Sequence, residues 1–87
     1  MDIDNVSLSI SDKAAKRVRL AFLPPVDHPA HETSKTLKEL VAATMTKLES
    51  IQSDQTTEEA RERARCASIA VTHLETAAMY AVKAATG

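Results

Sequence analysis

The segment 57–85 contains neither proline nor glycine, and this constrains the fold more than any other feature of the chain. At its start, Thr56-Thr57-Glu58-Glu59 offers a Thr-x-x-Glu capping box, which predicts that a helix begins there. One face of this helix has the apolar spacing needed to pack on a second helix, and it consists of Ala60, Ala64, Ala67, Val71, Leu74, Ala78, Ala81 and Ala85. Another apolar face consists of Cys66, Ala70, Ala77, Tyr80 and Ala84. A helix that is apolar over most of its circumference needs more than one packing partner.

A shorter helix is predicted over residues 34–51. Its apolar side chains follow the 3-and-4 spacing of a single helical stripe, namely Leu37, Leu40, Val41, Met45 and Leu48. Thr33 or Ser34 can serve as its N-cap. The polar segment 52–55 is short enough to join the two helices as an antiparallel hairpin. The sequence therefore predicts a mainly α-helical chain whose helical-hairpin domain spans residues 31–87.

Residues 1–30 are expected to form an extended N-terminal arm. Residues 6–10 and 17–20 alternate apolar and polar side chains, which favours two short strands and a small β-hairpin. Residues 11–15 between them can either turn the chain or start a helical turn. Three prolines then predict a stiff connector over residues 23–30, because proline lacks a backbone donor and holds the preceding residue in an extended conformation.

A chain of 87 residues with one phenylalanine, one tyrosine and fifteen alanines cannot build a thick core by itself. Oligomerisation would supply the second packing partner of the long helix. Cys66 is the only cysteine, which excludes an intrachain disulfide and a cysteine-based zinc site, and we expect it to be buried and unreactive. No apolar run approaches the ~20 residues of a membrane span, and residues 1–15 lack the apolar region of a signal peptide. We therefore expect a cytoplasmic protein.

The charges of the chain are nearly balanced, with 11 basic and 12 acidic side chains, which argues against binding to long nucleic acid. A small nucleic-acid-binding regulator would depend on one local basic cluster, formed by Lys13, Lys16, Arg17 and Arg19. This cluster could meet phosphates, and a solvated loop explains it equally well. The net charge alone therefore makes nucleic-acid binding a weak third hypothesis.

Catalysis and metal binding find little support in the sequence. The group Asp27, His28, His31 and Glu32 does not match the spacing of a standard metal site. No serine or cysteine nucleophile with an orienting base is recognisable, and a glycine-rich phosphate loop is excluded because the chain has a single glycine. We therefore expect a non-enzymatic protein without cofactor or metal.

Several polar side chains interrupt the apolar surface of the long helix, namely Arg65, Thr72, His73, Glu75, Thr76 and Lys83. An arginine in an interface is costly unless it meets an anion or an acidic side chain. Arg65 could alternatively pair with Glu58 or Glu62 on its own helix, and the threonine hydroxyls could bond back to the backbone. Glu75 could be the buried partner of a neighbouring cation. The residues alone leave both interpretations open.

Three segments resemble one known family. The run Ser-Ile-Ala-Val-Thr-His-Leu-Glu-Thr-Ala-Ala-Met-Tyr-Ala-Val-Lys-Ala-Ala-Thr over residues 68–86 is similar to the C-terminal helix of the phage hairpin family of anti-CBASS and Thoeris anti-defence sponges, with Tyr80 in place of the usual tryptophan. Arg-Val-Arg-Leu-Ala-Phe-Leu-Pro over residues 17–24 resembles the segment that leads into that family's hairpin, and Leu-Lys-Glu-Leu over residues 37–40 has counterparts in its first helix. The resemblance covers residues 17–86.

The resemblance implies a helical hairpin that assembles into dimers to hexamers and binds immune second messengers without cleaving them. The implied ligands are cyclic dinucleotides, cyclic trinucleotides and cyclic ADP-ribose isomers, and their capture would inhibit CBASS or Thoeris signalling in the host cytoplasm. Phe22 would stack on a base, Lys38 would pair with a phosphate, and Arg65 would contact phosphate at a junction of several subunits. Thr72 and Thr76 would donate hydrogen bonds.

Three further residues complete the candidate site. Arg17 and Arg19 are included because of their charge alone. Pro24 is included because it lies in the segment that leads into the hairpin. The candidate ligand-binding residues are thus Arg17, Arg19, Phe22, Pro24, Lys38, Arg65, Thr72 and Thr76. The alternative hypothesis is a structural or adaptor protein whose alanine-rich helix only self-associates or docks to a partner.

Overall fold

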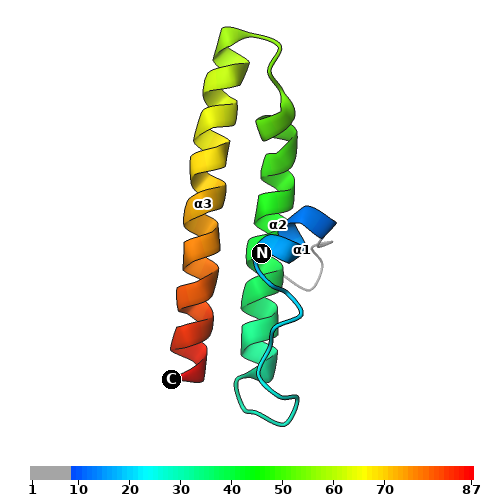
Figure 1. Cartoon of the computed structure of the whole chain (residues 1–87), viewed down its shortest axis with the longest axis vertical. Helices are drawn as coiled ribbons and strands as arrows, with labels where there is room; N and C mark the ends of the chain where they lie inside the picture. Colours follow the sequence, from blue (N-terminus) through cyan, green and yellow to red (C-terminus); the bar gives the residue numbers. More distant parts are fainter. Residues whose placement is uncertain (1–8) are drawn as a thin grey trace, which may run out of the picture.

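The computed structural model describes residues 9–87. In chain order it contains α1 (Asp12–Arg17), α2 (His31–Ser53) and α3 (Glu58–Thr86), and the described residues include no strand. The long helices α2 and α3 lie side by side and antiparallel, and α1 lies across α2 near the middle of its length (Figure 1). The predicted two-helix hairpin is confirmed, with each helix end within three residues of its predicted position.

Most of the buried apolar residues of α2 and α3 are alanines. Ala42 and Ala43 of α2 are buried, as are five residues of the predicted inner face of α3: Ala60, Ala64, Ala67, Val71 and Ala78. Such short side chains allow two helix axes to approach closely. Met45 is the largest fully buried side chain and fills the space where α1 joins the hairpin. The packing face of α3 is therefore the one that the apolar spacing predicted.

The two long helices begin in different ways. Thr57 is the N-cap of α3, and its Oγ1 accepts a hydrogen bond from the Ala60 N–H at 2.9 Å. The predicted capping box of Thr56 and Glu59 is wrong, because a cap at Thr57 puts Ala60 at the third helical position. The predicted N-cap of α2 at Thr33 or Ser34 is wrong, because α2 begins at His31 with Ala30 as its N-cap. Turns of the proline-rich connector lead directly into α2, since the His31 N–H donates to the His28 oxygen at 3.0 Å.

The prediction of a strand over residues 17–20 is also wrong. Ser11 caps α1, with its Oγ accepting from the Ala14 N–H at 3.1 Å, and its own N–H donates to Thr46 Oγ1 of α2 at 3.0 Å. Ala14 and Val18 lie one helical turn apart and both enter the core. Helical burial of these two residues therefore overrides the local alternation. In the other predicted strand, residues 6–8 lie outside the described residues, and residues 9 and 10 have no regular structure.

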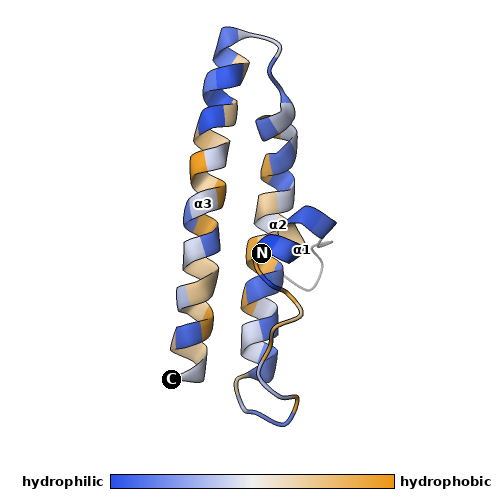
Figure 2. Cartoon of the chain, viewed as in Figure 1, coloured by the Kyte–Doolittle hydropathy of each residue, from blue (hydrophilic) through white to orange (hydrophobic). Residues whose placement is uncertain are grey.

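The outer face of α3 is exposed in the single chain, and apolar residues recur along the whole helix (Figure 2). Ile69, Met79 and Tyr80 are 44%, 63% and 61% exposed. Cys66 is exposed as well, so the prediction that it is buried does not hold for the single chain. None of the described helices is long and apolar enough to cross a membrane.

Ser34 gives a direct test of the packing at the start of α2. Its side chain is fully buried, and its Oγ has no hydrogen-bond partner within the described part of the chain. Burying a hydroxyl without a partner costs about 1–3 kcal/mol, and alanine has the higher helix propensity. Ser34→Ala is therefore expected to raise the free energy of unfolding by about 1–2 kcal/mol, measured by urea unfolding followed by circular dichroism at fixed protein concentration. The exposed Ser50→Ala serves as a control and should change stability by less than about 0.5 kcal/mol. A destabilised Ser34→Ala variant would mean that the hydroxyl has a partner in solution.

Candidate ligand-binding site

The turn that follows α1 holds an arginine in an unusual backbone conformation. The Leu20 N–H donates to the Ala15 oxygen at 3.0 Å, and the Arg19 N–H donates to the Lys16 oxygen at 3.1 Å. This is the Schellman pattern, in which the residue at the position of Arg19 is usually glycine. Arg19 has φ 52°, a left-handed conformation that costs a residue with a side chain about 1–2 kcal/mol. This conformation sets the direction in which the exposed Arg19 side chain leaves the turn.

Lys38 of α2 fastens this turn to the hairpin. Its side chain is only 7% exposed, and its Nζ donates to the backbone oxygen of Arg19 at 2.8 Å and to that of Phe22. Burial, and to a smaller extent the neighbouring charge of Arg19, lowers the pKa of Lys38. An ammonium group has three N–H donors, so two of them are committed to the backbone. Lys38 thus positions the turn, a role that its predicted pairing with phosphate did not include.

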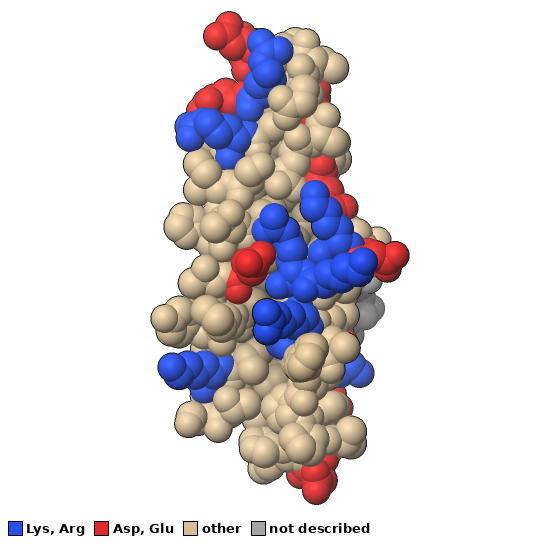
Figure 3. All heavy atoms as spheres, in the orientation of Figure 1, with Lys and Arg blue, Asp and Glu red and all other residues tan. Residues whose placement is uncertain are grey.

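A pocket of about 390 Å³ lies between this turn and α3, a volume typical of small-molecule sites. Its lining combines cationic, aromatic, acidic and apolar side chains, from Arg17, Val18, Arg19, Phe22, Lys38, Glu75, Ala78, Met79 and Val82. Phe22 is 74% exposed, so its ring is open to a flat partner. A second, more open hollow of about 580 Å³ shares Arg19 and Phe22 with this pocket. Lysine and arginine side chains gather on the same face of the molecule, around α1 (Figure 3).

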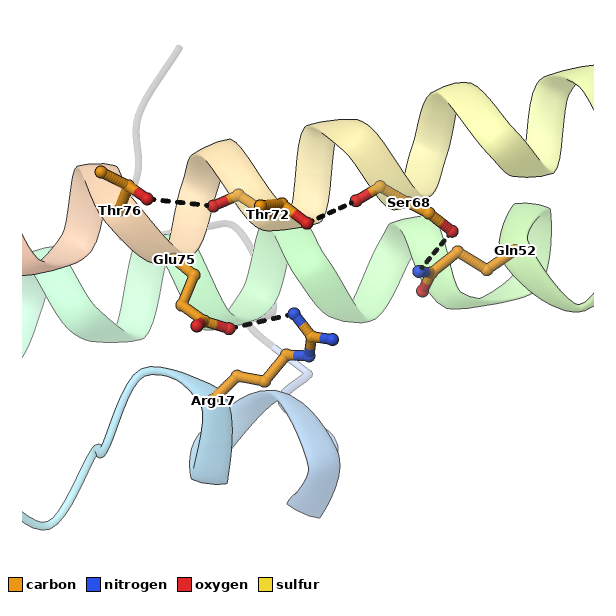
Figure 4. A network of polar contacts seen from close by, with 6 residues as sticks. All are labelled: Arg17, Gln52, Ser68, Thr72, Glu75 and Thr76. Atoms are coloured by element: carbon orange, nitrogen blue, oxygen red, sulfur yellow. Dashed lines mark hydrogen bonds and ion pairs between the residues drawn. The ribbon is translucent and has the colours of Figure 1, made fainter.

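One ion pair bridges the pocket. Arg17 at the end of α1 donates from Nη1 to Glu75 Oε2 of α3 at 3.0 Å, and both side chains are roughly half exposed (Figure 4). A pair at this exposure contributes only about 0–1 kcal/mol to stability. An anionic ligand can therefore compete for the Arg17 guanidinium without a large loss of folding energy.

The structure brings four of the predicted site residues together, because Arg17, Arg19, Phe22 and Lys38 all line this pocket. Pro24 does not line it. The Pro24 carbonyl oxygen instead contacts Nδ1 of His31 at 2.8 Å, within the connector.

The remaining three predicted residues lie outside this pocket, on the exposed surface of α3. Arg65 pairs with Glu62 at 2.6 Å, and the hydrogen bonds and charge of this pair raise the pKa of Arg65 and lower that of Glu62. The hydroxyl of Thr72 donates to the Ser68 oxygen at 3.1 Å, and that of Thr76 to the Thr72 oxygen at 3.4 Å (Figure 4). In the single chain these three side chains thus bond within their own helix.

The α3 side of the pocket consists of Glu75, Ala78, Met79 and Val82, none of which is among the predicted site residues. Glu75 was expected only as the buried partner of a neighbouring cation, and it pairs with Arg17 while its side chain stays 49% exposed. The four residues are spaced 3, 4 and 7 positions apart and therefore share one helical stripe. This stripe can be recognised in the sequence. It could not be assigned to a binding site while residues 17–20 were expected to form a strand, because only the observed path of α1 places Arg17 and Phe22 opposite the stripe.

His28 of the connector and His31, the first residue of α2, have local structural partners. His28 Nδ1 accepts from the Ala30 N–H at 3.0 Å, while His31 contacts the Pro24 oxygen as described above. Within residues 9–87, no three histidine, cysteine, aspartate or glutamate side chains gather closely enough to hold a metal ion.

Fold and pocket together define a class: small helical-hairpin binding proteins whose site suits an anion that carries a flat ring. Comparison with known families agrees with this class. The family model described as Acb2/Tad1, hairpin domain, matches residues 12–86, from the first residue of α1 to the last of α3. The chain therefore belongs to the Acb2/Tad1 hairpin family, the anti-CBASS and anti-Thoeris sponges, which bind cyclic nucleotide signals without catalysis. Searches of curated proteins and of solved structures gave no match.

Proposed function

We propose that this protein sequesters cyclic dinucleotides, cyclic trinucleotides or cyclic ADP-ribose isomers in the host cytoplasm and thereby prevents the activation of CBASS or Thoeris effectors. The observation that carries the proposal is the pocket that Arg17 and Arg19 line together with the exposed ring of Phe22. Arginine binds phosphate through paired, charge-assisted hydrogen bonds. Stacking of a base on an aromatic ring adds about 1–3 kcal/mol. A ligand with both a phosphate and a base would use both kinds of group.

Binding alone suffices for this function. An inhibitor of this kind lowers the free concentration of the signal, so its capacity and affinity matter, and the bound ligand is released unchanged. The pocket suits this role, because its cations and apolar side chains can hold a nucleotide, while its one carboxylate is paired with an arginine.

We expect the protein to assemble into dimers up to hexamers through the outer face of α3. This face exposes Ile69 and Tyr80 in the single chain, and a second copy would bury them. Arg65, Thr72 and Thr76 are spaced 7 and 4 residues apart, so they lie along one stripe of the same exposed surface. A junction between subunits would bring the stripes of several chains together, which makes these three residues candidates for a second group of ligand contacts.

The proposal is tested by incubating the protein with a panel of cyclic di- and trinucleotides and cyclic ADP-ribose isomers. After unbound ligand is removed, heat denaturation should release the bound ligand, and mass spectrometry should show it intact. A hydrolysed product, or the absence of any bound ligand, would contradict sequestration.

The adaptor hypothesis also draws on the exposed face of α3, and native mass spectrometry distinguishes it from the sponge. The sponge should appear as an oligomer that retains an added cyclic nucleotide. An oligomer that retains none of the ligands would favour the adaptor.

Arg65→Ala is expected to weaken ligand binding at the proposed subunit junction by about tenfold, since a charged hydrogen bond contributes about 1.5–3 kcal/mol. Helix content should not change, because the exposed pair with Glu62 adds little to stability. Isothermal titration calorimetry and circular dichroism measure the two effects. The matched control is Arg61→Ala, which removes an exposed arginine near the hairpin turn. Unchanged affinity in Arg65→Ala would remove Arg65 from the site.

A further inference from the structure

The pocket between α1 and α3 has an uneven set of hydrogen-bonding side chains. Arg17, Arg19 and Lys38 can only donate, and the remaining lining residues other than Glu75 are apolar. Among the described residues that line the pocket, Glu75 is thus the single side chain that accepts hydrogen bonds. A ligand's phosphates have two arginines to bind there, because two of the Lys38 donors are committed to the backbone, whereas a ligand's N–H groups have one side chain to bind.

Glu75 points toward the residues of the turn. Its Oε2 accepts from Arg17 of α1 at 3.0 Å, so the carboxylate of α3 faces α1 in the single chain (Figure 4). A carboxylate has about four acceptor positions, so this pairing leaves Oε1 and part of Oε2 available. The side chain is 49% exposed, which makes these positions accessible. Met79 lies four residues after Glu75 on the same helix and supplies an apolar surface beside the carboxylate.

Nucleobases differ in what they offer to such a carboxylate. The Watson–Crick edge of guanine presents two adjacent donors, N1–H and the N2 amino group, which match the two oxygens of one carboxylate. The same edge of adenine presents one donor, the N6 amino group, beside the acceptor N1, whose lone pair faces the carboxylate unfavourably. One good bidentate contact discriminates between bases by about tenfold or more.

We propose that Glu75 is a specificity-determining residue, which selects cyclic nucleotides that place a guanine in this pocket. The inference depends on the proposed function, because it requires that the pocket binds a nucleotide. The base lies between Phe22 and the apolar stripe of α3, its N1–H and N2 amino group donate to Glu75, and the phosphates face Arg17 and Arg19.

The test compares cyclic di-GMP with cyclic di-AMP, two ligands with the same ring and phosphates that differ in their bases. Calorimetric dissociation constants are measured for the unmodified chain, for Glu75→Gln and for the control Glu58→Gln, which makes the same charge change in the exposed first turn of α3. The unmodified chain and the control should bind cyclic di-GMP more tightly. Glu75→Gln should lower this preference by about tenfold or more, because its carboxamide donates one hydrogen bond and accepts one, as the adenine edge requires.

Other outcomes overturn the inference in distinguishable ways. If Glu75→Gln weakens the binding of both ligands equally, Glu75 only positions Arg17. If the variant binds both ligands more tightly by the same factor, Glu75 only repels phosphate. A preference of the unmodified chain for cyclic di-AMP also excludes guanine selection. If the folded, unmodified chain binds neither these two ligands nor any other cyclic nucleotide, the proposed function fails together with this inference.

Discussion

Replacing Phe22 with alanine is expected to weaken the binding of a cyclic dinucleotide by about ten- to a hundredfold while the protein stays folded. Base stacking on an aromatic side chain is worth about 1–3 kcal/mol, and each 1.4 kcal/mol corresponds to about a factor of ten in affinity. The ring is 74% exposed, so its loss should change the free energy of unfolding by less than about 0.5 kcal/mol. The Phe22 backbone oxygen still accepts from Lys38 in the variant. Calorimetric titration and urea unfolding measure the two quantities.

Val26→Ala is the matched control for this variant. Val26 is 84% exposed in the same connector and does not line the pocket. Phe22→Tyr should bind nearly as tightly as the unmodified chain, because the aromatic face is kept. If Phe22→Ala and Val26→Ala lose affinity equally, the effect comes from the connector in general, and stacking on Phe22 is excluded.

The hairpin could be predicted because local signals and long-range packing agree over residues 31–87. The apolar spacing of α3 shows which face packs on α2, and the predicted start of this helix lies within one residue of the observed one, although Thr57 is the cap in place of Thr56. No such agreement exists around residues 17–20. Their alternation is compatible with a strand, and only the burial of Ala14 and Val18 against α2 selects a helix and a turn instead. Ser11 and Asp12 favour the start of α1 locally, whereas its continuation to Arg17 and the turn after it depend on tertiary contacts.

The candidate site, like the fold, could be predicted only in part from the sequence. Charge and family resemblance pointed to Arg17, Arg19, Phe22 and Lys38, which the structure brings into one pocket. The role of Lys38 could not be foreseen, because its two acceptors are backbone oxygens 16 and 19 residues away that meet only when the turn after α1 folds. Glu75 carried a visible charge, but its place in the pocket depends on the same turn.

Replacing Lys38 with methionine is expected to lower both stability and ligand affinity. Methionine keeps an apolar chain of similar length in the buried position, and the ammonium group is lost. The two charged hydrogen bonds to the turn are each worth about 1.5–3 kcal/mol, and relief from burying a charge offsets part of this. We expect the free energy of unfolding to fall by about 2–3 kcal/mol. Affinity for a cyclic dinucleotide should fall about tenfold or more, because the strained turn no longer fixes Arg19 and Phe22.

Lys47→Met is the control, because Lys47 is exposed on the same helix. Its stability and affinity should both stay close to those of the unmodified chain. Normal ligand affinity in a destabilised Lys38→Met variant would show that Lys38 supports the fold without positioning the site.

The contribution of Lys38 to stability should also depend on pH. Burial lowers the pKa of Lys38 in the folded chain, whereas an unfolded lysine keeps a value of about 10.4. Between these two pKa values the unfolded chain binds more protons, so the contribution of Lys38 to the free energy of unfolding rises with pH. The neutral amine still has two N–H donors for its two backbone acceptors. The stability difference between the unmodified chain and Lys38→Met should therefore widen as the pH rises toward about 10.4, the pKa of an unfolded lysine. If the stability difference narrows as the pH rises, the folded chain favours the charged ammonium group of Lys38. This would mean that the two backbone oxygens stabilise the charge by more than burial destabilises it.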